Sequence, residues 1–568
     1  MLPAESPEVE PVVNREPVSY EAGRTDEFSL VDLDKLERYR SRYELRFVSP
    51  NAYWYIEEGI RVDQGEIEKT AAEFERIIYP RVTDYFGSEW KPGVDNDPHL
   101  TILHGDIRGA GGYYSSSDEY PKAIRPHSNE REMIYINISY LQFGSQSHLR
   151  VLAHELNHAI LWNSDSSEDT WVSEGLAELS TTIAGYGQDF SVRHFLRSPH
   201  VPLVHWPLDD SLISAHYGGA SLFMYYLNEH YPPRDGNGLV TLMQEPEDNI
   251  EGVNVYLRDQ GYEREFHDLL KDWVAANFLD DSQGLYGYDS LEVEVEEGRV
   301  LSRPDVIERR IAQYGTHYIE LGSDLRNSRV KLTFEGQGSV RLLPTEVGEA
   351  GCWWSNAGDA MVSTLTTEVD LTSATEATLS YDAWFSIEED WDYTYLQVSE
   401  DGGEHWVILE TPHTSDEDPL QVAFGPGYTG ESGGWLAENV DLAPYLGKQI
   451  MVRFQYVTDD ALNGIGMCVA GASITVDGMP NPPNWTPHGF ILVDNELPQE
   501  FIVQVIQKGS ENRVERMSAT YVEPGTWKGE LHIEPYEALE RAMIAITATA
   551  PVTRVKASYR LLVENVGE

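Results

Sequence analysis

The sequence contains few cysteines, few basic residues and no long apolar run. Its two cysteines, Cys352 and Cys468, are too few for a disulfide-rich scaffold in a chain of 568 residues. No apolar stretch approaches the roughly eighteen residues that a membrane-spanning helix requires, so no membrane span is predicted. The sequence has 95 acidic and only 41 basic residues. The resulting net charge of −54 repels phosphate backbones and anionic membranes. We therefore expect no nucleic-acid partner.

The first residues read MLPAESPEVEPVV. They lack the basic start and the apolar core of a signal peptide, and we interpret residues 1–40 as an acidic, proline-rich linker. A secreted protein without its leader would begin in this way, and so would a cytosolic one, so this segment leaves the localisation open. The sequence is equally silent about the oligomeric state.

A chain of this length is expected to fold as several domains. Residues 41–285 mix short strand patterns such as HLTILHGD with segments of helical spacing, which predicts an α+β domain. From about residue 286 the pattern changes to alternating strands separated by turn residues, which predicts an all-β second half, organised as two sandwiches. The proline cluster DGMPNPPNWTP marks a boundary near residue 480.

The most specific chemical signal is the stretch VLAHELNHAILWN, Val151 to Asn163. On a helix, His154 and His158 lie one turn apart on the same face, so both imidazoles can bind one metal ion. Glu155 follows the first histidine directly and can polarise a water without binding the metal itself.

A second acidic pair follows in TWVSEGLAELS, where Glu174 and Glu178 are one helical turn apart. A catalytic zinc site needs three protein ligands and an open fourth position, and a second helix could supply the third ligand. Glu174 could be that ligand, and Glu178 could then hold one imidazole through its other ring nitrogen. The alternative is a pair of acidic residues on a solvated helix face.

Together, HELNH and WVSEGLAEL resemble the gluzincin zinc metallopeptidases. The resemblance implies a zincin-like catalytic domain over residues 41–285, with Zn²⁺ bound by His154, His158 and a glutamate. The distance along the chain from His158 to Glu174 is shorter than in the best-known members, and spacing alone would favour Glu178. The W-x-x-E-G context favours Glu174, and shorter spacings occur among hyicolysin-like relatives.

A third segment, AHYGGASLFMYYLNEHY, resembles the gluzincin element in which a tyrosine faces the substrate carbonyl. This resemblance implies that Tyr217 stabilises the oxyanion, with the neighbouring His216 as the alternative donor. An aromatic packing residue is the other interpretation of Tyr217. The G-x-M-E-N element of aminopeptidase gluzincins is absent from the sequence, which favours an endopeptidase.

In the β half, CWWSNAGDAM, SIEEDWDYTYLQVSEDGGEHW and the segments after them resemble the jelly-roll, or MAM-like, module of immune inhibitor A-type peptidases. The resemblance places this module at residues 347–480, between a β segment at 286–346 and a final β-sandwich part at 481–568. It also implies secretion, because such modules accompany extracellular bacterial enzymes. The segments on either side of the module look like two parts of one further sandwich, into which the module is inserted.

Two further features fall within this module. The acidic residues Glu388, Glu389, Asp390 and Asp392 offer hard oxygen ligands for Ca²⁺, although a solvated loop is the alternative. A bridge between Cys352 and Cys468 would close the module if they lie on neighbouring strands; the alternative is two buried free thiols.

These observations predict a multidomain, secreted, zinc-dependent endopeptidase that hydrolyses proteins or peptides. Glu155 is the general base and Tyr217 the oxyanion donor, while His154, His158 and Glu174 bind zinc. An aminopeptidase with the same zinc site and a non-catalytic adhesin are the alternatives. The sequence does not predict the cleavage preference.

Overall fold

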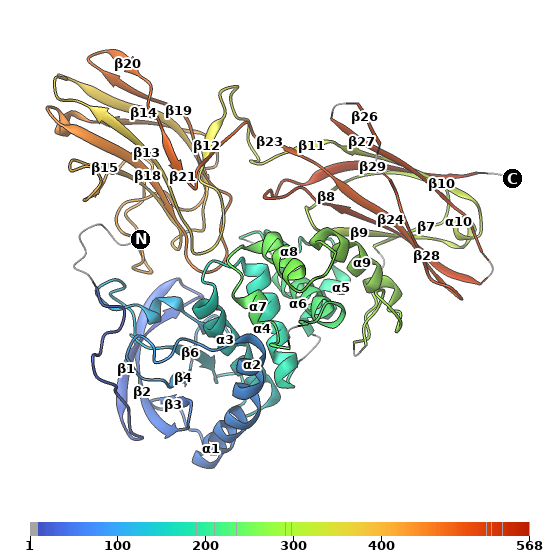
Figure 1. Ribbon diagram of the computed structural model, residues 1–568, viewed down its shortest axis with the longest axis horizontal. Coiled ribbons are helices and arrows are strands. Elements are labelled where there is room, and N and C mark those ends of the chain that lie inside the picture. The colour runs from blue at the N-terminus through green and yellow to red at the C-terminus, as the bar shows by residue number, and fades with distance from the viewer. Residues whose placement is uncertain are drawn as a thin grey trace. The chain divides into compact units, whose positions relative to one another are not determined.

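The computed structural model describes residues 9–187, 190–208, 211–234, 236–289, 291–296, 298–518, 520–523, 525–536 and 538–566. The chain divides into two compact units, each made of three chain segments (Figure 1). The first unit comprises residues 1–188, 236–246 and 347–493, and the second comprises 189–235, 247–346 and 494–568. Among the helices of the described residues, none has the length and apolar character needed to cross a bilayer.

The amino-terminal part of the first unit is a six-stranded sheet with helices. The strand order is β1-β2-β3-β4-β6-β5, in which β3, β4 and β6 pair in parallel and β5 is an antiparallel edge strand. The strands are β1 (Thr25–Asp32), β2 (Glu37–Val48), β3 (Ala52–Glu57), β4 (Leu100–Gly105), β5 (Gly112–Tyr114) and β6 (Met133–Asn137). The helices are α1 (Gln64–Glu73), η1 (Phe74–Ile78), α2 (Tyr79–Phe86), η2 (Ser116–Glu119), α3 (Gln146–Ser164), α4 (Thr170–Ala184) and α7 (Val240–Met243).

Two of the parallel strands, β4 and β6, lie in the interior of this sheet. Every residue of β4 and β6 is buried, as expected for parallel strands that are covered on both faces. The sheet also begins earlier than the predicted domain. The prediction of a linker over residues 1–40 is wrong from Thr25 onward, because Phe28 and Leu30 of β1 are buried in the core of the sheet.

The carboxyl-terminal part of the first unit is a β-sandwich. One sheet has the order β17-β14-β19-β12-β22, with β20 beside β19, and the other has the order β16-β15-β18-β13-β21. The strands of the first sheet are β12 (Cys352–Trp354), β14 (Ala377–Ser386), β17 (Leu436–Asp441), β19 (Gly466–Val476), β20 (Met479–Asn481) and β22 (Ile491–Val493). Those of the second are β13 (Val362–Asp370), β15 (Tyr393–Ser399), β16 (Val407–Ile408), β18 (Gln449–Val457) and β21 (Thr486–His488), and η3 spans Ala443–Tyr445.

A disulfide joins Cys352 on β12 to Cys468 on the adjacent strand β19, with their Cα atoms 5.7 Å apart. The module extends beyond the boundary expected near residue 480. After the proline cluster, β21 pairs with β13 and β22 pairs with β12, so the chain completes both sheets before it leaves the sandwich.

The second unit combines helices with another sandwich. The helices are α5 (Phe190–Arg197), α6 (Ile213–His230), α8 (Asn249–Asp259), α9 (Phe266–Leu279) and α10 (Ser323–Arg326). One sheet has the order β26-β27-β10-β29-β8, the other has the order β25-β24-β28-β9-β7, and β11 pairs with β23. The strands are β7 (Arg299–Leu301), β8 (Asp305–Ile311), β9 (Thr316–Leu321), β10 (Val330–Gln337), β11 (Ser339–Arg341), β23 (Glu496–Pro498), β24 (Phe501–Gly509), β25 (Arg513–Arg516), β26 (Thr520–Glu523), β27 (Thr526–Ile533), β28 (Leu539–Ala548) and β29 (Ala557–Asn565).

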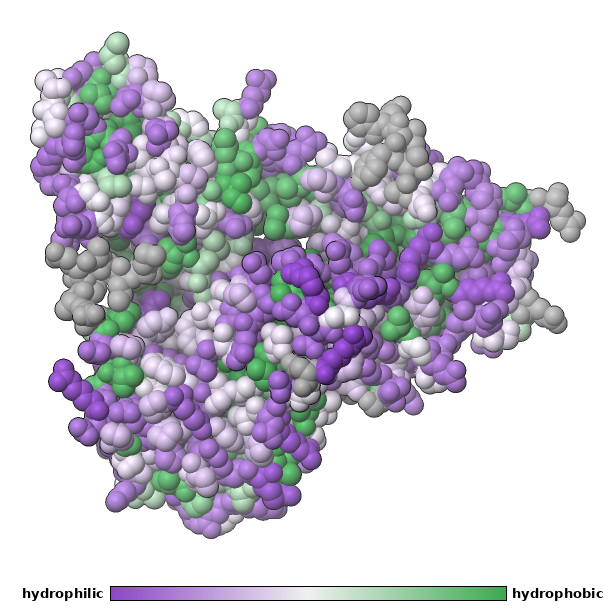
Figure 2. All heavy atoms as spheres, viewed as in Figure 1, coloured by the Kyte–Doolittle hydropathy of each residue, from purple (hydrophilic) through white to green (hydrophobic). Residues whose placement is uncertain are grey.

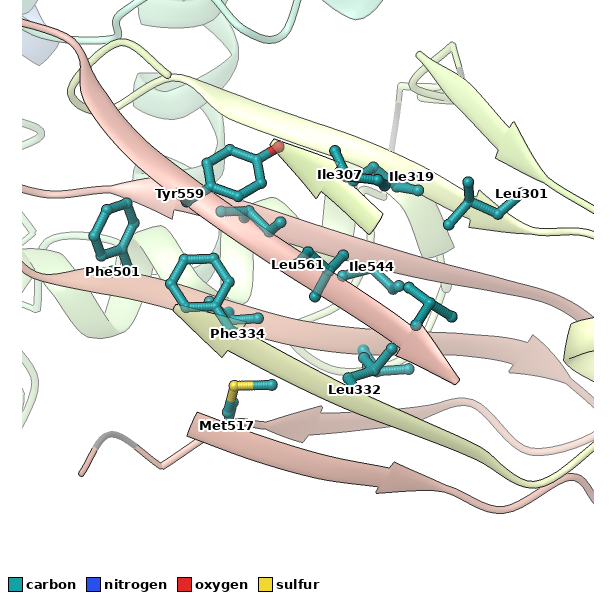
Figure 3. Close-up of a cluster of buried hydrophobic side chains, with 14 of the residues drawn as sticks. Leu301, Ile307, Ile319, Leu332, Phe334, Phe501, Met517, Ile544, Tyr559 and Leu561 are labelled. Atoms are coloured by element: carbon teal, nitrogen blue, oxygen red, sulfur yellow. The ribbon is translucent and has the colours of Figure 1, made fainter. Parts of the chain in front are cut away.

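Strands from before and after the inserted module form this sandwich together. Figure 3 shows its core, in which the ring of Phe334 of β10 packs against Phe501 of β24 and Tyr559 of β29, at centroid distances of 5.1 Å and 5.6 Å, respectively. The chain is therefore multidomain with an all-β carboxyl-terminal region, as the sequence predicted. Hydrophilic residues cover most of the face seen in Figure 2, in keeping with the net charge of −54.

Candidate metal centre

Two neighbouring helices of the first unit carry the residues of the HELNH and EGLAE motifs. Ser145 caps the start of α3, since its hydroxyl accepts a hydrogen bond from the backbone N–H of His148. Gly185 caps the end of α4, and its φ of 93° lies in the left-handed region that glycine adopts readily. The helices pack directly, since the hydroxyl of Ser180 on α4 lies 2.9 Å from the carbonyl oxygen of Ala153 on α3. This packing brings the two motifs together.

Three ligand atoms from these helices converge on one point. Nε2 of His154 lies 3.2 Å from Nε2 of His158 and 3.3 Å from Oε2 of Glu174, and Nε2 of His158 lies 3.6 Å from the same oxygen. Tetrahedral zinc with ligands at about 2.0–2.1 Å has ligand atoms about 3.3–3.4 Å apart. The spacing and the donor set of two imidazoles and one carboxylate therefore fit a zinc ion.

The outer nitrogens of both imidazoles also face polar groups. Nδ1 of His154 lies 3.5 Å from Oε1 of Glu178, and Nδ1 of His158 lies 3.2 Å from the hydroxyl of Ser173. Arg150, one turn before His154 on α3, forms an ion pair with Glu178. The sequence interpretation did not include Arg150 or Ser173. A signal for Arg150 was present, because a residue four positions before a ligand lies on the same helix face.

The electrostatic environment of the three ligand residues favours a cation. Burial by itself would raise the pKa of Glu174, but His158 and His154 outweigh it and hold that pKa well below its usual value. Burial by itself would lower the pKa of His154, but Glu174, Glu155 and Glu178 together raise it to about 9. The carboxylates thus stabilise positive charge at this point.

Glu155 lies beside the open edge of the six-stranded sheet. Its side chain is 5% exposed, and burial raises the pKa of its carboxyl group. A Cβ added to Gly112 of β5 would lie 3.0 Å from Oε1 of Glu155 and 2.6 Å from Cγ1 of Val151, so only a glycine fits here without a shift. Among the described strands β5 pairs only with β6, and an extended chain could therefore be added at this edge.

The two candidates for the oxyanion donor lie on α6, in the second unit. His216 is fully buried, and its Nδ1 lies 3.0 Å from the carbonyl oxygen of Pro202. Tyr217 is half-buried, with its ring centroid 5.2 Å from that of Trp206. Within its own unit Tyr217 is thus the more accessible of the two, and its role stays a prediction.

The acidic residues predicted to bind calcium do not act as one group. Glu388 and Asp392 come together with Asp459, a residue that the sequence interpretation did not include. Glu389 is exposed, and Asp390 has a φ of 66° at the turn between Glu388 and Asp392. Neither belongs to the group of potential ligands formed by the other three.

Similarity to known proteins lies in the all-β part of the chain. Residues 318–481 match the family model of the immune inhibitor A-like MAM domain, which begins within β9 and covers most of the first-unit sandwich. The chain is 29% identical over 153 residues to the pre-pro-metalloprotease PrtV of Vibrio cholerae serotype O1, an alignment that covers 27% of this chain and 16% of PrtV. It is 28% identical over 127 residues to immune inhibitor A of Bacillus thuringiensis subsp. alesti, which covers 22% of this chain and 17% of that protein.

The chain therefore spans less than one fifth of the length of these two relatives. The match to the family model does not include α3 and α4. Among solved structures, dimeric latent PorU from Porphyromonas gingivalis aligns with 40% of this chain and 22% of its own at 12% identity, and the TM-score of 0.13 supports no structural inference. An immune inhibitor A-like β module and distant similarity to a named metalloprotease are what these comparisons show.

Proposed function

We propose that the protein is a zinc-dependent endopeptidase with a zincin-like domain built on α3, α4 and the six-stranded sheet. The convergence of His154, His158 and Glu174 on one point, with spacings that fit tetrahedral zinc, is the observation that carries the proposal. Similarity to the metalloprotease PrtV in the β part supports it.

In this proposal each residue has one task. His154, His158 and Glu174 hold the ion, and Glu178 and Ser173 fix the orientation of the two imidazoles from behind. Bound zinc would supply Lewis acidity, which lowers the pKa of a water and polarises a carbonyl group. Glu155 accepts a proton from the attacking water and delivers it to the departing amide nitrogen. Tyr217 is the proposed hydrogen-bond donor to the developing oxyanion.

The open edge of β5 supports an endopeptidase over a peptidase that requires a free amino terminus. An extended peptide paired with β5 would run past Glu155 in both directions, because backbone pairing places no limit on its length. We propose proteins or peptides as substrates and, from the kind of module in the β half, an extracellular site of action.

The decisive experiment compares Glu155→Gln with the native chain for zinc content and casein hydrolysis. We expect the variant to retain zinc and to lose activity by a factor of about 10²–10⁴, since a glutamine side chain cannot accept the proton. The exposed Glu66 gives a control, and Glu66→Gln should behave as the native chain does. Full activity of Glu155→Gln, or absence of zinc from the native chain, would contradict the proposal. Peptides with blocked and free amino termini distinguish an endopeptidase from an aminopeptidase.

A further inference from the structure

A second group of potential metal ligands lies in the first-unit sandwich. Ligand oxygens of Glu388, Asp392 and Asp459 all lie within 4.8 Å of one another. Glu388 and Asp392 belong to the connection between β14 and β15, and Asp459 follows β18. Two separate loops thus bring three carboxylates to one place.

The local backbone holds this arrangement. The N–H of Asp392 donates to the carbonyl of Glu388 at 3.1 Å, so the chain makes one helical turn and both side chains leave it on the same side. Thr429 fixes the turn from a neighbouring segment, since its hydroxyl donates to the carbonyl of Glu388 and accepts from the N–H of Asp390. Asp392 is connected to the second loop, because its Oδ1 accepts from the N–H of Asp459 at 2.8 Å.

Asp392 provides a second, independent observation. Its side chain is 0% exposed, and its Oδ2 has no hydrogen-bond partner among the described residues. An isolated buried carboxylate oxygen is costly unless a proton or a cation compensates it. The charged groups that act most strongly on Asp392 are carboxylates as well, since burial, Asp359 and Asp460 raise its pKa well above the usual value.

We propose that Glu388, Asp392 and Asp459 bind a divalent cation, and that this cation is Ca²⁺. All three ligands are carboxylates, and oxygen ligands of this kind select hard cations over zinc or copper. Ligands from two separate loops suit the adaptable coordination of Ca²⁺ better than the strict octahedron of Mg²⁺.

The cation would stabilise a contact between the sandwich and α4. The loop that follows Asp459 lies against the first residue of this helix, because the N–H of Leu462 donates to the hydroxyl of Thr170 at 2.8 Å. Asp359 accepts from the N–H and the hydroxyl of Thr170 at 2.9 Å and 2.6 Å. Asn463 donates to the other oxygen of Asp359 at 2.7 Å.

α4 also carries Glu174, so the cation site and the candidate zinc site share a helix. An ordered loop 459–463 would hold Thr170 at the start of α4 in place, four residues before Glu174. Any effect on zinc binding rests on the proposed function, whereas Ca²⁺ binding and its effect on α4 do not.

The first experiment titrates CaCl₂ into the chelator-treated, full-length chain and measures heat. We expect one site in the native chain and at least tenfold weaker binding in Asp392→Asn. Glu389→Gln is the matched control, since it removes the same charge from the exposed neighbour of Glu388 and should bind Ca²⁺ as the native chain does. Equal affinities in all three chains, or no binding to the native chain, would overturn the proposal.

Thermal unfolding shows whether Asp392→Asn binds Ca²⁺ less well because a ligand side chain is gone or because the variant is misfolded. Without the cation, Asp392→Asn should unfold at the same temperature as the native chain or above it, because asparagine keeps an oxygen acceptor for the N–H of Asp459 and cannot ionise among the neighbouring carboxylates. Saturating Ca²⁺ should raise the unfolding temperature of the native chain only. Two results together would contradict the cation site: Asp392→Asn unfolds at a lower temperature than the native chain without Ca²⁺, and Ca²⁺ leaves the unfolding temperature of the native chain unchanged. Asp392 would then have a structural role instead. Asp459→Asn repeats the test from the other loop.

Hydrogen exchange tests the contact with α4. Ca²⁺ should slow the exchange of amides in the first two turns of α4 several-fold in the native chain and leave them unchanged in Asp392→Asn. If Ca²⁺ binds and these amides do not respond, the coupling to α4 is wrong. Because exchange is read without added zinc, this result does not depend on the proposed peptidase activity.

Discussion

Oε1 of Glu178 lies 3.5 Å from Nδ1 of His154, whereas Oε2 of Glu174 lies 3.3 Å from Nε2 of the same ring. The two glutamates thus face opposite nitrogens of one imidazole. Only Glu174 shares its side of the ring with His158, and only there do three ligand atoms converge. This geometry supports the proposal that Glu174 is the third ligand and that Glu178 orients His154.

The pair of variants Glu174→Gln and Glu178→Gln tests this division. Glu174→Gln removes the anionic ligand and should abolish zinc binding at micromolar concentrations. Glu178→Gln keeps the ligand set and should weaken zinc binding about 10–100-fold, the usual effect of losing a partner of a metal-bound histidine. Competition with a chromophoric chelator measures both affinities without reference to catalysis. If Glu178→Gln is the variant that loses zinc, the assignment of the two glutamates must be exchanged.

We expect Arg150 to affect the stability of the protein and its zinc affinity through its ion pair with Glu178. The ion pair is largely shielded from solvent, with side-chain exposures of 21% for Arg150 and 6% for Glu178. Arg150→Met keeps the length of the side chain but leaves the carboxylate without its charged partner, and we expect a loss of about 1–3 kcal/mol in unfolding free energy. Zinc affinity should fall as well, because Glu178 becomes free to turn away from His154.

A matched control for Arg150→Met is Arg76→Met, which breaks the exposed ion pair with Glu73. Exposed pairs contribute little, so its unfolding free energy should change by less than about 1 kcal/mol. Urea denaturation in zinc-free buffer compares the two variants. Equal losses in both would show that Arg150 has no special role.

The sequence predicts those features that lie within one short segment. HELNH and EGLAE each occupy one face of one helix, so their spacing alone shows that the side chains can act together. The disulfide and the cation site depend on strand pairing. Asp459 follows Asp392 by 67 residues, and no local pattern connects the two. For the same reason, Glu389 and Asp390 looked equivalent to Glu388 in the sequence, although the turn directs them elsewhere.

Composition is misleading where a few buried residues decide the structure. The amino-terminal region is rich in proline and glutamate, yet Phe28 and Leu30 place residues from Thr25 onward in the sheet. The proline cluster after residue 478 resembled a domain boundary, but the strands on both sides of it belong to one sandwich. In both cases strand pairing and burial, which composition does not record, outweighed the local signal.

Gly112 provides a test of the edge strand. Replacement by alanine would place a Cβ 2.6 Å from Cγ1 of Val151 and 2.8 Å from the carbonyl oxygen of Tyr135, so β5 or α3 must shift. We expect Gly112→Ala to bind zinc as the native chain does and to hydrolyse casein at least tenfold more slowly, because the edge and Glu155 move apart. Gly348→Ala, at an exposed position with no atom near the added Cβ, is the control for a glycine replacement without a clash. Unchanged casein hydrolysis by Gly112→Ala would remove β5 from the proposed substrate site.

Glu119 should make the stability of the first unit depend on pH. Its side chain is buried, and this burial raises the pKa of its carboxyl group from 4.5 to about 8, with smaller contributions from Asp118, Glu89 and Asp460. The hydroxyl of Tyr114, which donates a hydrogen bond to Glu119 at 2.8 Å, opposes this shift. Because the pKa is higher in the folded state, the folded protein retains a proton that the unfolded chain releases. This contribution to stability is complete below about pH 4.5 and is lost as the pH rises through about 8.

Glu119→Gln isolates this contribution. Glutamine keeps an acceptor for Tyr114 and does not ionise, so the variant should gain stability relative to the native chain as the pH rises from 5 to 8. The difference in unfolding free energy should grow by at most about 1.4 kcal/mol per pH unit, the limit for a single proton. Urea denaturation across this pH range, followed by tryptophan fluorescence, measures it, and Glu66→Gln serves as the exposed control. A constant difference between Glu119→Gln and the native chain from pH 5 to 8 would show that Glu119 does not titrate in this range.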